Sequence, residues 1–166
     1  MDTGTTLIGI GFILLMVLPF VAYYLVQKVK ARRFVRHFFH SSASHNLSLD
    51  QNDTWRRNYA IGIDSGANQL FYLNKGKTPE QEAVIDLSKV AKCRVSNGIK
   101  SVKTDNGTKD FTDILGLAFT FSDPGKDEVI LEFYDGSELM SHPDGELEIA
   151  ERWLATVNSC IKSKTK

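Results

Sequence analysis

Residues 115–135 read LGLAFTFSDPGKDEVILEFYD and contain the clearest structural signal in the chain. Leucine and phenylalanine alternate with small or polar residues before Asp123-Pro124-Gly125, a sequence typical of a tight turn, and the alternation resumes after it. A period of two is expected when one face of a strand is buried and the other is exposed to water. The stretch therefore predicts two half-buried antiparallel strands joined as a hairpin.

Similar patterns extend back along the chain as far as residue 59. Asn97-Gly98 and Asn106-Gly107 are hairpin turn signals, because asparagine and glycine tolerate the positive φ that such turns require. Short apolar or alternating runs between turn-forming residues are typical of strands. Further strand segments are expected at 59–63, 70–73, 83–87, 90–95 and 99–102.

The last segment changes to the period of a helix. Asp144 is the expected N-cap, because a short polar side chain can accept a hydrogen bond from the first helical turn. Apolar residues at helical spacing predict a face that packs on the sheet. This apolar stripe consists of Leu147, Ala150, Leu154, Val157 and Ile161, with Trp153 beside it.

The segment 148–157, EIAERWLATV, looks like the closing helix of the pleckstrin-homology family. In that family a helix tryptophan packs over one open end of a β-barrel, and Trp153 matches it as a structural residue. The resemblance covers residues 59–162. It implies an α+β fold in which an antiparallel PH-like barrel of six to seven strands is capped by the C-terminal helix, with the whole domain at 59–166.

The resemblance also bears on function. Members that bind phosphoinositides have lysine and arginine on the first two strands, whereas residues 59–74 contain neither. Phosphate binding there would lack charge-assisted hydrogen bonds. The resemblance therefore implies the family's other role, as a protein-interaction module.

Residues 7–26 read LIGIGFILLMVLPFVAYYLV and contain no charge. A helix of this length, at about 1.5 Å per residue, matches the roughly 30 Å hydrocarbon core of a bilayer. The stretch predicts a single transmembrane helix. A cleaved signal peptide is the rival interpretation, but residues 1–6 contain no lysine or arginine and the apolar run is too long.

Cations follow the apolar run directly. Because positive flanks remain in the cytoplasm, they predict a plasma or inner membrane protein with a short extracytoplasmic tail at 1–6 and a cytoplasmic domain at 59–166. Residues 27–40 are expected to form a basic juxtamembrane helix. Its cations either control only topology or also contact anionic headgroups at the membrane surface. These candidate surface residues are Lys28, Lys30, Arg32, Arg33 and Arg36.

Residues 41–58 are rich in serine and asparagine and lack periodicity, so they are expected to be a polar linker. Trp55 is the exception, and we expect it to dock on the following domain. Glycosylation sequons occur at Asn46, Asn52 and Asn106. The chain contains many asparagine, serine and threonine residues, so we interpret these sequons as chance matches.

No pattern of an active site, metal site or cofactor site is present, and the chain is predicted not to be an enzyme. Residues 59–166 contain 13 basic and 17 acidic residues, giving 13 − 17 = −4, which argues against a nucleic-acid partner. Cys93 and Cys160 are interpreted as reduced thiols, with one disulfide as the alternative. Other weak candidates for chemistry are His37, His40, His45, Ser65, His142 and the acidic group Asp123, Asp127 and Glu128.

Together these features predict a membrane-tethered interaction or scaffold protein without catalytic activity, whose protein partner is unknown. The alternative is a protein that binds or handles lipid through the basic helix or through a pocket in the barrel.

Overall fold

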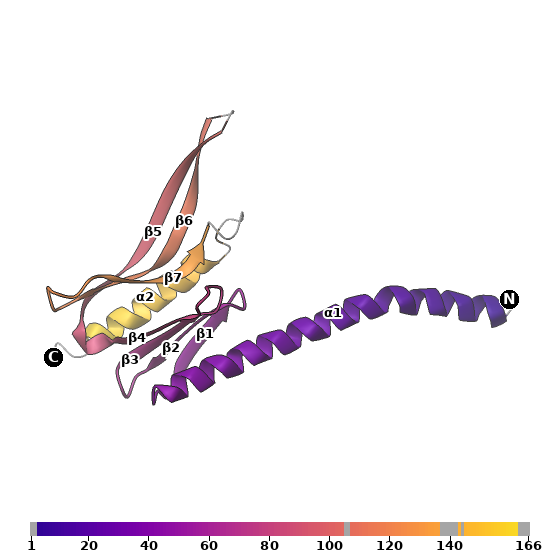
Figure 1. Cartoon of the computed structure of the whole chain (residues 1–166), viewed down its shortest axis with the longest axis horizontal. Helices are drawn as coiled ribbons and strands as arrows, with labels where there is room; N and C mark the ends of the chain where they lie inside the picture. The colour runs from indigo at the N-terminus through magenta and orange to yellow at the C-terminus, as the bar shows by residue number, and fades with distance from the viewer. Residues whose placement is uncertain (1–2, 105–106, 137–142, 144, 163–166) are drawn as a thin grey trace. The chain divides into compact units, whose positions relative to one another are not determined.

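The computed structural model describes the backbone of residues 3–104, 107–136, 143 and 145–162, and the side chains of 15–98, 114–136, 143 and 145–161. The chain forms two compact units, residues 1–41 and 42–166. Figure 1 shows one long helix, α1 (Thr3–Ser44), which forms the first unit up to residue 41. Residues 42–44 of this helix belong to the second unit.

Helix α1 includes both the apolar run at 7–26 and the cationic segment that follows it. Its side chains are described from Leu15 onward, and they include Lys28, Lys30 and Arg32. Charged groups are costly in hydrocarbon. Within the described residues, no helix is long and apolar enough to cross a bilayer.

This finding contradicts the predicted transmembrane helix at 7–26. It equally overturns the predicted integral membrane partner, the plasma or inner membrane location and the topology that placed residues 59–166 in the cytoplasm, since all three were derived from that helix.

Within its described residues, the second unit contains seven strands, one short 3-10 helix and one α-helix. The strands pair antiparallel in two separate sheets, ordered β1-β2-β3-β4 and β5-β6-β7. The elements are β1 (Gln51–Trp55), β2 (Tyr59–Asp64), β3 (Gln69–Asn74), β4 (Gln81–Asp86), η1 (Leu87–Lys89), β5 (Val90–Thr104), β6 (Gly107–Phe121), β7 (Val129–Asp135) and α2 (Glu146–Lys162).

The predicted closed barrel is therefore wrong. The ladder is interrupted between β4 and β5, where Asp86 caps η1 by accepting a 3.0 Å hydrogen bond from the backbone N–H of Ser88. This turn directs the chain away from β4, so β5 begins the second sheet instead of extending the first. A continuous strand over 83–95 would instead have extended the ladder of the first sheet.

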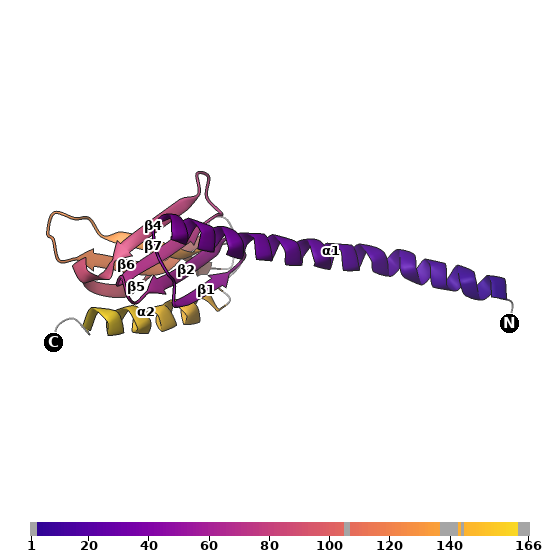
Figure 2. The same ribbon diagram turned by 90° about the horizontal axis from the view of Figure 1, so that it is seen from below.

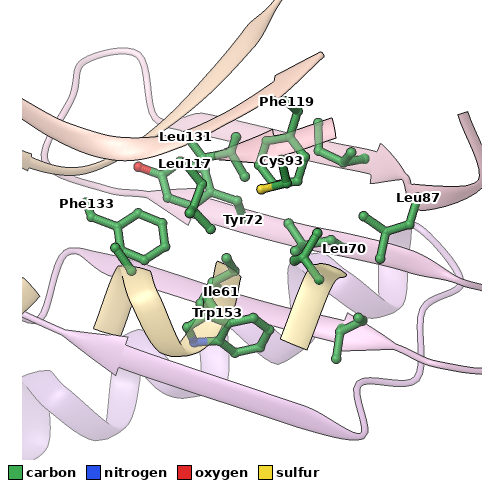
Figure 3. Packing of buried hydrophobic residues seen from close by; sticks show 14 of the residues in the cluster. Ile61, Leu70, Tyr72, Leu87, Cys93, Leu117, Phe119, Leu131, Phe133 and Trp153 are labelled. Atoms are coloured by element: carbon green, nitrogen blue, oxygen red, sulfur yellow. The ribbon is translucent and has the colours of Figure 1, made fainter. Parts of the chain in front are cut away.

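The hydrophobic core lies where the two sheets and α2 meet. Figure 3 shows Ile61 and Tyr72 of one sheet, and Leu117 and Phe133 of the other, gathered near Trp153 of α2. Figure 2 shows α2 along one side of this unit. Its Ala150, Trp153 and Val157 are fully buried, whereas Leu147, predicted for the same stripe, is 45% exposed. The predicted N-cap Asp144 lies outside the described residues.

Strand β1 occupies part of the segment predicted to be a linker. Its five residues pair with β2, from Gln51 opposite Ile63 to Trp55 opposite Tyr59. The connection back to β2 uses positive φ angles at Arg56 (46°) and Arg57 (59°), which permit a tight reversal. β1 is an edge strand in which only Trp55 is buried, so its other residues are polar. This polar composition gave no strand pattern in the sequence.

Candidate functional site

Trp55 joins β1 to the second sheet. Its indole Nε1 donates a 2.8 Å hydrogen bond to the backbone carbonyl oxygen of Phe133, and the two ring centroids lie 4.6 Å apart. Phe133 is an extra residue in β7, because Leu115 is opposite Tyr134 and Gly116 is opposite Glu132. The bond therefore stabilises a β-bulge, a place where ladder pairing is interrupted.

Gly116 is required on the other side of this bulge. A Cβ atom there would lie 2.3 Å from the backbone oxygen of Leu131, which is closer than atoms can approach. The close approach of β6 and β7 explains a glycine in an otherwise apolar strand.

Asp53 joins β1 to helix α2. Its Oδ2 accepts hydrogen bonds from Nε1 of Trp153 at 2.7 Å and from the guanidinium of Arg152 at 2.8 Å. Trp153, the predicted structural residue, is completely buried and its only N–H is thereby satisfied. Sequence alone missed Asp53, which appeared to belong to a solvated linker.

Arg56 forms an ion pair with Glu146 at the start of α2, and it also lies 5.2 Å from the ring centroid of Tyr134. Glu146 is only 3% exposed, so its charge is compensated where water is largely excluded. The hydrogen bond to Glu146 raises the pKa of Arg56 further above its ordinary value. The side-chain interactions of Trp55, Asp53 and Arg56 hold β1, β7 and α2 together, and we call them the clamps of this unit. They give this side of the unit a structural role.

The acidic group Asp123, Asp127 and Glu128 does not form a cation site. Both carboxylate oxygens of Glu128 are bound by one guanidinium nitrogen of Arg94, at 3.1 and 2.9 Å, and Thr120 also donates to Glu128. Asp123 accepts from the backbone N–H of Gly125 within the turn. Among the described residues, no three His, Cys, Asp or Glu side chains are grouped as metal ligands.

The other weak candidates are dispersed. Cys93 and Cys160 are not joined by a disulfide within the described structure, and burial raises the pKa of Cys93 to about 12. Nε2 of His45 lies 3.3 Å from Glu82, and its ring packs against Phe71. Ser65 donates its backbone N–H to Asp50. His142 and the sequon residue Asn106 lie outside the described residues.

The five predicted surface cations of α1 are all exposed. Lys28, Arg32 and Arg36 are spaced by four residues and therefore share one side of the helix. Phe34 and Phe38, two residues after Arg32 and Arg36, are buried. Contact of these cations with a membrane surface stays a prediction.

The outer part of the β5–β6 hairpin extends beyond the three-stranded part of its sheet. β5 and β6 pair from Val90 opposite Phe121 to Thr104 opposite Gly107, whereas β7 pairs with β6 only from 114 to 119. The remainder, 99–104 with 107–112, is a two-stranded ribbon that extends beyond the end of β7 (Figure 1). We call this ribbon the hairpin arm.

Sequence reasoning missed the hairpin arm because Asn97-Gly98 indicated a turn. The structure instead passes β5 straight through this pair and accommodates it with a change of register between Gly98 and Ile99. Glycine inside a strand commonly marks such a bulge, so the signal was present but ambiguous.

Comparison with known proteins identifies no relative: no family model, no curated protein and no solved structure matches the chain. The resemblance to the pleckstrin-homology family therefore stays a prediction from one helical segment and the order of the strands.

Proposed function

We propose that this chain is a non-catalytic protein-interaction module and that the hairpin arm is its docking element. The observation that supports the proposal most is the difference in length between the strands of one sheet. β5 and β6 each have 15 residues, whereas β7 has 7 and covers only part of β6.

A two-stranded ribbon is only marginally stable in water, and a third strand or a packed surface stabilises it. The arm nevertheless continues the ladder as far as Thr104 and Gly107. Along 107–112, the edge of β6 that β7 occupies further on has no strand paired to it within the described part of the chain. Open edges are templates for backbone hydrogen bonds to another chain.

The mode of recognition that fits this geometry is strand addition. An extended segment of a partner would pair with β6 beyond β7 and continue the line of that strand. Backbone hydrogen bonds would supply affinity, and neighbouring side chains would supply selectivity. The rest of the unit serves as a rigid base, since Trp55, Asp53 and Arg56 fix β7, β1 and α2 around one core.

The test removes the arm and leaves the base intact. Replacing residues 99–113 by Asn-Gly would close the hairpin at the pair Gly98–Ile114 with a two-residue turn. The full chain and this variant are used as bait in lysate from cells that express the chain, and bound proteins are quantified. The control variant Glu148→Gln changes one exposed residue of α2.

We call the protein with residues 99–113 replaced the short-arm variant. We expect it and the full chain to have the same melting temperature. At least one partner should be recovered by the full chain and by Glu148→Gln, but not by the short-arm variant. Equal recovery of every partner by the short-arm variant would show that the arm is not the docking element.

A further inference from the structure

The exposed side of α1 between Lys28 and Arg36 carries a concentration of charge that nothing in the helix compensates. Helix α1 contains five cations in its 42 residues and no aspartate or glutamate. Lys28 and Arg32, and likewise Arg32 and Arg36, are like charges at i and i+4, a spacing that destabilises a helix. The structure describes no ion pair or hydrogen bond for any of the five.

The position of these cations in the helix excludes one internal explanation. Cations stabilise the last turn of a helix through its dipole, but this effect is confined to that turn. The last turn of α1 contains no basic residue, and Arg36 lies eight residues before its end at Ser44. The cations therefore do not act as a C-terminal cap.

The same side of the helix also presents apolar groups. Leu25 and Val29 are 54% and 46% exposed, and each precedes a cation, Lys28 and Arg32 respectively, by three residues. Residues three apart are neighbours on a helix surface, so apolar and cationic groups alternate along this side. Buried Phe34 and Phe38 lie about 160° around the axis from Arg32 and Arg36, at 100° per residue.

We infer that this side of α1 binds an acidic amphipathic helix of a partner protein. Carboxylates spaced by four residues on such a helix would lie about 6 Å apart, which matches the spacing of Lys28, Arg32 and Arg36. Two of the three cations on this side, Arg32 and Arg36, are arginines, whose planar guanidinium pairs with a carboxylate through two parallel hydrogen bonds. Apolar residues beside the carboxylates would cover Leu25 and Val29.

This inference does not rest on the hairpin arm, since the short-arm variant leaves α1 unchanged. The probe is a synthetic fluorescent helix with Glu at every fourth position and Leu beside each Glu, compared with the same peptide containing Gln. Anisotropy with the full chain at 0.1 M salt should show binding of the Glu peptide about tenfold tighter than the Gln peptide. The difference should largely disappear at 1 M salt, where the Debye length falls to about 3 Å.

Charge reversal tests whether Arg32 contacts the carboxylates of the peptide. Arg32→Glu should weaken binding of the Glu peptide about tenfold, and a peptide containing Lys at the facing position should restore it. Lys92→Glu, the same change at an exposed residue of β5, should have no effect. Circular dichroism confirms that each variant retains its helix.

Three results would overturn the inference. The first is equal affinity for the Glu and Gln peptides, and the second is an unchanged affinity in Arg32→Glu. The third is co-sedimentation with phosphatidylglycerol vesicles by a chain that does not bind the Glu peptide, which would assign the cations to phosphate groups instead.

Discussion

The indole Nε1 of Trp55 and the carbonyl oxygen of Phe133 are 2.8 Å apart, and this hydrogen bond connects an edge strand of one sheet to a bulge in the other. The two residues are 78 positions apart in sequence. The bond is buried and is supported by the packing of the two rings. It connects β1, which the sequence pattern did not predict, to β7, which lies in the clearest strand pattern of the sequence.

Substitutions of Trp55 should separate the contribution of its hydrogen bond to stability from the contribution of its ring packing. Trp55→Phe retains an aromatic ring but leaves the Phe133 carbonyl without this donor, so we expect a loss of about 1–3 kcal/mol in the free energy of unfolding. Trp55→Ala also leaves a cavity and should cost about 3–5 kcal/mol. Urea unfolding measures both. Two variants as stable as wild type would mean that Trp55 does not support the fold.

Asp53 should matter more than its place in a polar segment suggests. Asp53→Ala removes the acceptor of the buried Trp153 N–H and the partner of Arg152, and we expect a loss of about 1–3 kcal/mol. Asn52→Ala, at the exposed neighbouring position of β1, should change stability by less than about 0.5 kcal/mol. Similar melting temperatures for the two variants would contradict the clamp between β1 and α2.

Glycine at 116 should be indispensable. Gly116→Ala forces β6 and β7 apart, because its Cβ would meet the backbone oxygen of Leu131, and we expect a loss of about 1–3 kcal/mol or more. Gly125→Ala is the matched control, since its Cβ would lie 3.5 Å from a side-chain oxygen of Asp123. Thermal unfolding decides, and equal effects of the two substitutions would rule out the close approach.

Stability should fall in acid partly through Asp64. The backbone N–H groups of Ala67 and Ser48 donate to its carboxylate at 2.8 and 2.7 Å and hold its pKa below the ordinary value. Because the folded-state pKa is lowered, this stabilisation is present above the unfolded pKa, about 3.9, and is lost as pH falls through the folded value.

The stability difference between wild type and Asp64→Asn should therefore be largest near pH 6 and shrink by pH 3. Urea unfolding at the two pH values measures it. A difference that is constant with pH would show that the charge of Asp64 does not contribute.

Local patterns in the sequence were more informative than the global assembly. Alternation at 59–63 and the apolar run at 70–73 correspond to β2 and β3, and the stretch at 115–135 contains the paired part of β6 and β7. These segments are recognisable because one or both faces are buried, which fixes the period of their apolar residues. Whether the strands close into a barrel depends instead on how the chain turns at η1, and at this turn the first sheet ends.

The remaining differences have separate physical causes. β1 is polar because it lies at a sheet edge, and Asn97-Gly98 fits a bulge as well as a turn. For α1, apolar composition at 7–26 predicted a membrane span, but the part of the helix whose side chains are described is not long and apolar enough to cross a bilayer. Asp53 and Arg56 could not be found, since their partners Trp153 and Glu146 are 100 and 90 residues away.

The central claim, that the hairpin arm receives a partner, is tested most directly by amide hydrogen exchange on the full chain. Exchange is measured with and without the partner that the full chain recovers and the short-arm variant does not. Alternate residues within 107–112 of β6, those whose N–H groups point away from β5, should become slower to exchange on binding, because they gain hydrogen bonds. Residues 114–119, already paired with β7, should change little. Unchanged exchange along 107–112, with new protection elsewhere in the chain, would contradict the account.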